Sequence, residues 1–305
     1  MTDGLGLLCM AMGTPASLDE IDAFYARIRG RPPAPELVRD LRARYAAIGG
    51  RSPLLEITRA QAEGVASRVG LRAYLGMKYS SPFISEAVRA MRDDGVRRAV
   101  ALPLAPHAAQ VTSSDYATMA RRAIAASGGG IELKLVRPWH LHPTFLAALA
   151  ARLVAALEEF PRDERDAIPV LFTAHSLPLR VVERGDPYPH AVRATARALA
   201  DRCALREWHV AWQSAGRTGE PWLGPDVSEV LPAVARTGVA GVVVAPIGFV
   251  SDHLEVLYDV DVQHRGIAAS LGLRLVRTAS LNDEPLFLDA LAEVVRVHLE
   301  ERGAA

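Results

Sequence analysis

The segment "VLFTAHSLPLR" (residues 170–180) joins a strand-like run to a loop that carries polar side chains. Small or apolar residues run from Val170 to Ala174 directly into His175, and a serine, a leucine and a proline follow. An apolar run of this length is typical of a strand in a parallel sheet that is covered on both faces. The segment therefore predicts a parallel α/β fold, with His175 where a strand ends.

Strand-like runs alternate with amphipathic segments along the whole chain. The predicted strands are Leu5–Ala11, Arg72–Gly76, Ala99–Leu104, Ile131–Val136, Pro169–Ala174, His209–Gln213, Gly241–Pro246 and Leu273–Val276. The predicted helices include Ser81–Asp94, Pro143–Glu159, Tyr188–Arg202, Val227–Thr237 and Pro285–Glu301. Repeated strand–helix units imply parallel strands joined by right-handed crossovers. The predicted fold class is α/β, with two doubly wound parallel sheets.

A chain of 305 residues suits two domains of ~150 residues each. Four predicted strands fall in each half, and the turn-rich stretch "RPWHLHP" (137–143) separates the halves. We therefore expect an N-terminal domain at 1–140, with an insertion at 29–52, and a C-terminal domain at 141–305. Ser17 and Glu20 predict a capping box at the start of the first helix.

Composition and motifs exclude several classes of protein. With 35 basic and 35 acidic side chains, the chain lacks the basic excess of a nucleic-acid binder. We see no signal-peptide pattern in "MTDGLGLLCM", no apolar run of the ~18 residues that a transmembrane helix needs, and no Walker loop. Cys9 and Cys203 are too few for a four-cysteine iron–sulfur cluster, and we expect reduced thiols in a cytoplasmic, monomeric protein.

In doubly wound folds, ligands bind beyond the carboxyl ends of the strands. The loops found there are "AMGTP" (11–15), "AHSLP" (174–178), "WQSAGRTGEPWLGPD" (212–226) and "PIGFVSDHLEVLYDVD" (246–261). In the last loop, Asp252, Glu255 and Asp259 have the i, i+3, i+7 spacing that places three carboxylates on one face of a helix. Such a row could lead a divalent cation inward, but Asp252 could equally cap the helix. For His175, a structural role and a ligand role both stay open.

Six stretches in order along the chain resemble the signature motifs of one family. They are "AMGTP", "IGGRSPL" (48–54), "TAHSLP" (173–178), "GDPYP" (185–189), "WQSAGRTGEPWLGPD" and "GFVSDHLEVLYDVD" (248–261). They resemble those of the ferrochelatases, which insert ferrous iron into a porphyrin, and most closely the bacterial type that acts on coproporphyrin III. The resemblance implies a class II chelatase fold, with two flavodoxin-like domains and a porphyrin cleft between them.

The resemblance also implies roles for individual residues. His175 and Glu255 match the catalytic, metal-contacting histidine and glutamate, and Asp252 and Asp259 match a possible outer metal path. The residues that match porphyrin-binding positions are Met12, Arg29, Arg44, Tyr45, Ser52 and Tyr116. The implied substrates are Fe2+ and coproporphyrin III, and no prosthetic group is implied.

These residue types suit the implied chemistry, which replaces two pyrrole N–H protons with a dication. A neutral imidazole can accept a proton near neutral pH and can also bind the metal, and the sequence does not separate these roles for His175. A carboxylate such as Glu255 offsets the charge of the dication. Arginine guanidinium groups suit the porphyrin propionates.

Met12 and Gln263 are among the residues that depart from the coproporphyrin pattern. Met12 stands where many coproporphyrin-type relatives have a tyrosine, and in this it resembles the protoporphyrin-type enzymes. Gln263 replaces a carboxylate expected one helical turn past Asp259. Protoporphyrin IX as the substrate, with protoheme as the product, therefore stays an alternative, and a non-catalytic tetrapyrrole or haem carrier is a second one.

Overall fold

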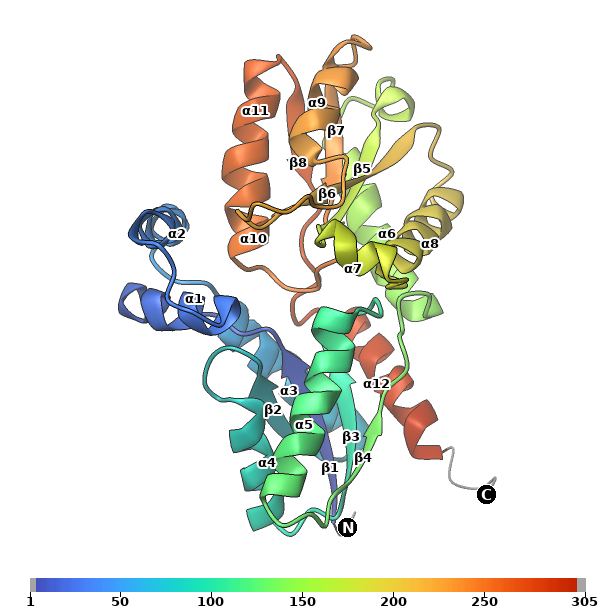
Figure 1. The fold of residues 1–305 in the computed structure, drawn as a ribbon. Helices are drawn as coiled ribbons and strands as arrows, with labels where there is room; N and C mark the ends of the chain where they lie inside the picture. Colours follow the sequence, from blue (N-terminus) through green and yellow to red (C-terminus); the bar gives the residue numbers. More distant parts are fainter. Residues whose placement is uncertain (1–3, 301–305) are drawn as a thin grey trace. The chain divides into compact units, whose positions relative to one another are not determined.

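Two four-stranded parallel sheets organise the chain in a computed structural model, which describes residues 4–300 (Figure 1). The strand order is β2-β1-β3-β4 in the first sheet and β6-β5-β7-β8 in the second. The strands are β1 (Leu5–Ala11), β2 (Arg72–Met77), β3 (Arg98–Pro103), β4 (Glu132–Leu135), β5 (Val170–His175), β6 (Trp208–Gln213), β7 (Gly241–Ala245) and β8 (Arg274–Arg277). The predicted α/β class is confirmed, and the ends of the eight predicted strands agree to within one residue.

Helices connect the strands and cover the sheets. They are α1 (Ile21–Arg29), α2 (Pro35–Ala47), α3 (Leu54–Val69), α4 (Ile84–Asp93), α5 (Asp115–Ala126), α6 (Pro143–Leu157), α7 (Leu179–Glu183), α8 (Tyr188–Arg202), α9 (Val227–Ala235), α10 (Leu254–Leu257), α11 (Arg265–Ser270) and α12 (Pro285–Glu300). The five predicted helices are all present, α8 with the predicted bounds. The predicted last residue of α12, Glu301, lies outside the described residues.

The predicted capping box is wrong. Ser17 precedes the 3₁₀ turn η1 (Leu18–Glu20), but its side chain makes no capping hydrogen bond. Instead, the carboxylate of Glu20 accepts a hydrogen bond from the backbone N–H of Ala16, at 3.1 Å. The motif is short and common, so the sequence alone does not distinguish a reciprocal cap from a one-sided one.

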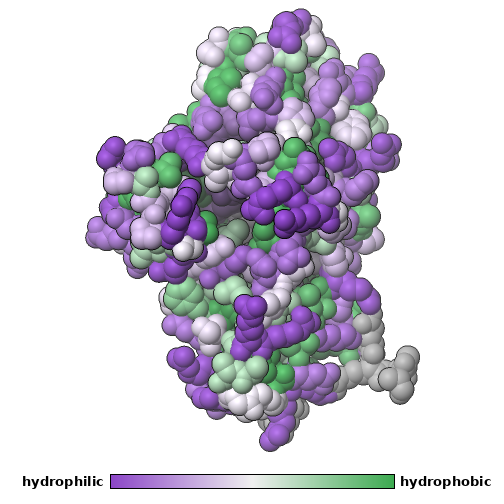
Figure 2. Space-filling view, in the orientation of Figure 1, coloured by the Kyte–Doolittle hydropathy of each residue, from purple (hydrophilic) through white to green (hydrophobic). Residues whose placement is uncertain are grey.

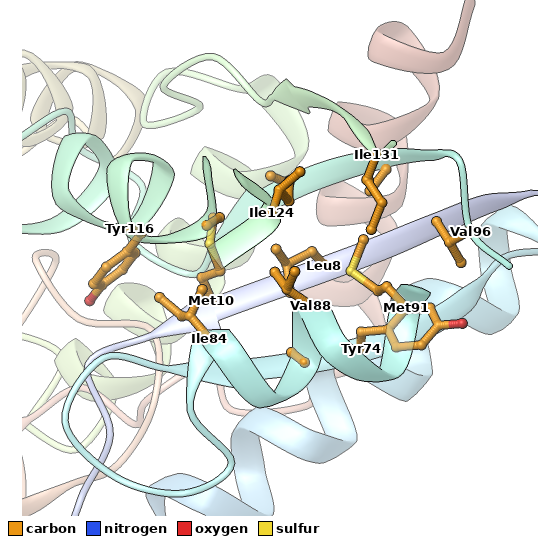
Figure 3. Packing of buried hydrophobic residues seen from close by; sticks show 14 residues of the cluster. Leu8, Met10, Tyr74, Ile84, Val88, Met91, Val96, Tyr116, Ile124 and Ile131 are labelled. Atoms are coloured by element: carbon orange, nitrogen blue, oxygen red, sulfur yellow. The ribbon is translucent and has the colours of Figure 1, made fainter. Parts of the chain in front are cut away.

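In the first unit, α4 and α5 cover one face of the sheet. Apolar side chains from these helices pack against those of the strands, as the close-up of the cluster shows (Figure 3). The cluster includes Leu8, Met10, Tyr74, Ile84, Val88, Met91, Tyr116 and Ile124. Helices α3 and α12 contact each other as well as strands of the same sheet. The central strands β1 and β3 are therefore buried on both faces, as their apolar runs predict.

The last helix belongs to the first unit, which differs from the expected boundaries. The chain divides into one unit that runs to Trp139 and resumes at Asn282, and a second unit at His140–Leu281. The rings of Trp139 and Phe287 lie 6.0 Å apart, and Arg68 of α3 pairs with Asp289 of α12 at 2.6 Å. The expected second domain at 141–305 is therefore too long at its C-terminal end. An amphipathic pattern shows that a helix has a buried face but not which sheet covers it.

The second unit has the same layered construction. Helices α9 and α11 contribute Val227, Leu231 and Ala268 to a core on one face of the sheet. Helices α6 and α8 contact each other, and α6 also contacts β7 and β8 while α8 contacts β6. Because all strand pairs are parallel, the carboxyl ends of β5, β6, β7 and β8 share one edge.

The surface agrees with the balanced composition. On the face shown in Figure 2, hydrophilic side chains cover most of the surface and hydrophobic ones form small separate patches. Among residues 4–300, no helix is both long and apolar enough to cross a membrane.

The buried histidine His264 gives the second unit a pH-dependent stability. It ends the π-helical segment η4 (Asp259–His264) and is 2% exposed. Burial lowers its pKa from 6.5 to about 4, against a smaller opposite effect of Asp226. Below pH ~6.5 the unfolded chain therefore binds a proton that the folded chain excludes, and stability falls as the pH falls.

We expect wild-type protein to lose roughly 2 kcal/mol of unfolding free energy between pH 7 and pH 5 through His264 alone. Urea unfolding of the wild type and of His264→Phe at both pH values measures this contribution as the difference between their pH dependences. Equal pH dependences would contradict the assignment.

Candidate active site

The second unit brings its polar loops together at the carboxyl edge of its sheet. His175 is the last residue of β5, and Gln213 is the last residue of the neighbouring strand β6 and pairs with it in register. The loop after β7 leads into α10, which carries Glu255. Parallel strands in the order β6-β5-β7 place these three segments side by side, as the rule for doubly wound sheets predicts.

His175 and Glu255 are in direct contact. The Nε2 atom of His175 lies 3.4 Å from Oε1 of Glu255, and the two side chains are 31% and 35% exposed. The Nδ1 atom of His175 hydrogen-bonds the backbone carbonyl of Ser176 and so carries its proton. The two residues that the sequence selects as catalytic thus form one half-buried pair.

A second histidine, His253, contacts the same carboxylate. Its Nε2 lies 3.5 Å from Oε2 of Glu255, and its Nδ1 donates to the carbonyl of Ser251 at 2.9 Å. Each oxygen of Glu255 therefore faces one imidazole. Sequence reasoning did not select His253, although its position two residues before Glu255 was a usable signal.

The charges in this group stabilise one another. Burial lowers the pKa of His175, but the adjacent Glu255 carboxylate, the bond to Ser176 and the charge of Asp259 together raise it to about 9. Burial raises the pKa of Glu255, but His175 and His253 hold it well below its usual range. At neutral pH the pair is therefore an imidazolium and a carboxylate. His175 contributes stability below its unfolded pKa of about 6.5, and this is lost as the pH rises through about 9.

A buried hydrogen-bond relay supports the position of Glu255. The hydroxyl of Thr173 donates to the side-chain oxygen of Gln213 at 2.6 Å, and the Gln213 amide donates to the backbone carbonyl of Glu255 at 2.7 Å. Thr173 and Gln213 are both fully buried. Next to Gln213, the hydroxyl of Ser214 donates to Asp259 at 2.5 Å. The relay ties the Glu255 segment to β5 and β6.

Gly248 allows the loop after β7 to approach β5. A Cβ atom at this position would lie 2.6 Å from Cβ and 2.8 Å from Cα of Ala174, the residue before His175. Such contacts require the backbone to shift. The loop that leads to Glu255 can therefore pass this close to β5 only with glycine at 248.

The prediction that Asp252, Glu255 and Asp259 lie on one face of a helix is wrong for Asp252. Helix α10 begins at Leu254, with His253 at its N-cap, so Asp252 precedes the helix and does not cap it. Its Oδ1 accepts from Ser280 at 2.7 Å and lies 3.5 Å from Arg277. Asp259 is 4% exposed at the start of η4. Within residues 4–300, no three histidine, cysteine or acidic side chains are arranged as a preformed metal site.

The predicted porphyrin-binding residues all lie in the first unit. Met12 follows β1 and is 38% exposed, and Arg29 ends α1, with its guanidinium over the ring of Tyr25. Arg44 pairs with Asp40 at 2.9 Å.

Three other porphyrin candidates are buried. The hydroxyl of Tyr45 hydrogen-bonds that of Thr14 at 3.1 Å, and the Ser52 hydroxyl accepts from the N–H of Leu54 at the start of α3. Tyr116 is 2% exposed in the core between α4 and α5, at one end of the cluster in Figure 3. In this structure these three side chains have packing and hydrogen-bonding roles, and porphyrin contact by them stays a prediction.

Solved structures of two chelatases have the same fold. A sirohydrochlorin chelatase SirB from Bacillus subtilis subspecies spizizenii, in complex with cobalt, aligns with a TM-score of 0.62 over 98% of this chain and 96% of that chain, at 14% identity. SirB from Bacillus subtilis with Fe3+ aligns with a TM-score of 0.63 over 96% and 94% of the chains, at 13% identity. The fold is that of the two-domain chelatases.

Sequence similarity then identifies the family. The family model for ferrochelatase matches residues 4–299. The ferrochelatase of Herpetosiphon aurantiacus is 41% identical over 97% of this chain and 99% of its own length. The coproporphyrin III ferrochelatase of Geobacillus kaustophilus is 42% identical over 98% and 97%. The chain belongs to the ferrochelatase family, whose members insert iron into a porphyrin, and the predicted resemblance is confirmed.

The contact between His175 and Glu255 has a spectroscopic signature. In wild-type protein free of metal and porphyrin, we expect the His175 imidazole to titrate with a pKa of about 9. In Glu255→Gln the negative charge is gone while burial remains, so the pKa should fall to or below the ordinary value of 6.5. A pH titration of the histidine ring signals by NMR measures both values. The same midpoint in both proteins would show that the pair does not form in solution.

Proposed function

We propose that this ferrochelatase inserts Fe2+ into coproporphyrin III to give coproheme, with release of two protons, as a step of haem formation in the cytoplasm. The observation that carries the catalytic part is the pair of His175 and Glu255, with Nε2 and Oε1 3.4 Å apart at the end of β5. An imidazole and a carboxylate in contact can exchange a proton for a metal ion, and metalation of a porphyrin requires both events.

The charge state of the pair defines an order of events. In the free protein, His175 is an imidazolium held by Glu255. When Fe2+ approaches Glu255, the dication competes with the imidazolium for the same carboxylate. The pKa of His175 then falls and its proton leaves to solvent. The neutral Nε2, whose side chain is 31% exposed, can then accept the two pyrrole protons one after the other and pass each to solvent. His253, on the other oxygen of Glu255, keeps that carboxylate oriented during the exchange.

An arginine-rich segment supports a substrate with many carboxylates. Residues 27–44, which span the end of α1 and most of α2, contain six arginines and two acidic residues. Coproporphyrin III carries four propionates, whereas protoporphyrin IX carries two. Guanidinium groups bind carboxylates in a two-pronged geometry. The predicted contacts Arg29 and Arg44 belong to this segment, and coproporphyrin III ferrochelatase is also the name of relatives at 39–42% identity.

Met12 favours protoporphyrin IX as the alternative substrate. Its side chain is exposed where β1 ends, and a thioether offers a weaker ligand than the tyrosine of many coproporphyrin-type enzymes. Relatives from Herpetosiphon aurantiacus and Deinococcus radiodurans, each 41% identical, are named simply as ferrochelatases.

Porphyrin fluorescence distinguishes the two substrates. Under anaerobic conditions with excess Fe2+, we expect multiple-turnover loss of fluorescence with coproporphyrin III and a kcat/KM at least about tenfold lower with protoporphyrin IX, since the latter forfeits two arginine–propionate contacts of about 1 kcal/mol each. Turnover on protoporphyrin IX alone would assign the protein to the other branch. Stoichiometric binding of both porphyrins without turnover would instead identify a carrier.

Replacement of His175 by alanine tests the catalytic role. We expect His175→Ala to bind porphyrin with unchanged affinity and to lose roughly 100-fold or more in kcat, the usual contribution of a general base. His209→Ala is the matched control, because His209 is an exposed histidine of the adjacent strand β6 that also contacts a glutamate, Glu207. Single-turnover metalation at the parental rate in His175→Ala would refute the assignment.

A further inference from the structure

The segment that carries Glu255 is too short to hold its own position. Helix α10 has only four residues, and the π-helical η4 follows it directly after Tyr258. Isolated helical segments of this length are unstable, so tertiary contacts must fix the segment. The relay through Gln213 holds the backbone of Glu255 from the side of β6. Strand β8, at the other edge of the sheet from β6, supplies a second contact that fixes the segment.

That second contact is made by Arg277, the last residue of the edge strand β8. Its Nε lies 2.9 Å from Oδ1 of Asp261, and its Nη1 lies 3.5 Å from Oδ1 of Asp252. The same Nη1 donates to the carbonyl of Thr278 at 3.1 Å and to the hydroxyl of Ser280 at 3.4 Å. Only 13% of the Arg277 side chain is exposed, and 22% of each aspartate. One guanidinium group thus holds two carboxylates at a half-buried position.

The two aspartates lie on either side of Glu255 in the sequence. Asp252 precedes α10 and Asp261 lies within η4, so Arg277 holds the segment both before and after the metal-contacting glutamate. Ser280 strengthens the first contact by donating to Asp252 at 2.7 Å. A planar guanidinium with several fixed donors can serve two acceptors at once, which a lysine ammonium does less well. Arg277 therefore fixes both ends of the segment 252–261 to β8.

We propose that Arg277 is a positioning residue for iron insertion, acting on Glu255 through Asp252 and Asp261. Without the guanidinium, the segment loses its contacts with β8 at both ends, although Asp261 keeps its ion pair with Arg265 at 3.2 Å, and the part between the two aspartates is free to move away from β8. The Glu255 carboxylate then loses its place opposite His175, while the predicted porphyrin-binding residues of the first unit are untouched. This inference rests on the proposed role of Glu255 in handling the metal.

Steady-state metalation kinetics test the proposal, with whichever porphyrin the wild type turns over. We expect Arg277→Met to lower kcat/KM for Fe2+ by about 10- to 100-fold, the usual effect of losing an outer partner of a metal-handling group. The KM for porphyrin should stay within about twofold of wild type. Arg274→Met is the matched control, because Arg274 lies on the same strand but pairs with Glu159 at the surface. Equal kinetics for the two variants would overturn the proposal.

Two further variants distinguish a positioning role of Arg277 from a general effect on charge balance or folding. The triple variant Arg277→Met, Asp252→Asn, Asp261→Asn removes all three charges of the cluster together and should fold as the wild type does. We expect its iron kinetics to stay impaired, because the contacts are still missing, and if they recover fully, Arg277 only neutralises charge and the proposal fails. Arg277→Lys should give intermediate kinetics, because it keeps the charge and loses the two-pronged geometry.

A double-mutant cycle tests whether Arg277 acts through Glu255. In a Glu255→Gln background, Arg277→Met should have less than about a twofold further effect on kcat/KM for Fe2+, since coupled residues are not additive. Additive losses would show that Arg277 acts by another route. If Glu255→Gln alone metalates normally, the proposed role of Glu255 fails, and this outcome is distinct from a normal Arg277→Met.

Discussion

A parallel sheet is stable only when helices cover both of its faces, and this constraint determines where chemistry can occur in each unit. The faces are closed by apolar packing, so polar side chains can gather only at the edges where strands end. In the second unit that edge carries His175, Gln213 and the loop to Glu255. The apolar run from Val170 to Ala174 and the histidine that follows it are therefore linked. Because the strand is buried and fixed by packing, the position of its last residue, His175, is fixed as well.

The sequence predicts the strands well because burial leaves a direct mark on composition. The run of β5 lies between Pro169 and His175, and that of β7 starts at Gly241 and stops before Pro246, so these residues fix the strand bounds to within one residue. Contacts between side chains of different segments leave no such pattern in the sequence. His253 faces Glu255 because α10 begins one residue later, and the start of that short helix depends on its surroundings. Asp252 misses the predicted row for the same reason. The sequence also does not indicate which sheet α12 packs against, since its apolar face would fit either one.

The electrostatics of the site reflect a balance between burial and pairing. Burial alone would favour a neutral imidazole and a neutral carboxyl group, whereas their contact favours the charged forms of both. The free protein therefore holds a proton on His175 with the same carboxylate that is proposed to receive the metal. In the proposed reaction, release of the His175 proton and arrival of the metal are coupled, because both depend on the Glu255 carboxylate.

The return of the chain to its first unit has a consequence for biosynthesis. The residues up to Trp139 leave the ribosome with one face of their sheet still lacking α12, which follows the whole second unit in the chain. The segment His140–Leu281 is continuous and can close its own core before α12 emerges. The first unit thus begins to emerge before the second unit and is completed after it. Until then, the apolar surface that awaits Phe287 and Leu291 is exposed to chaperones and to aggregation.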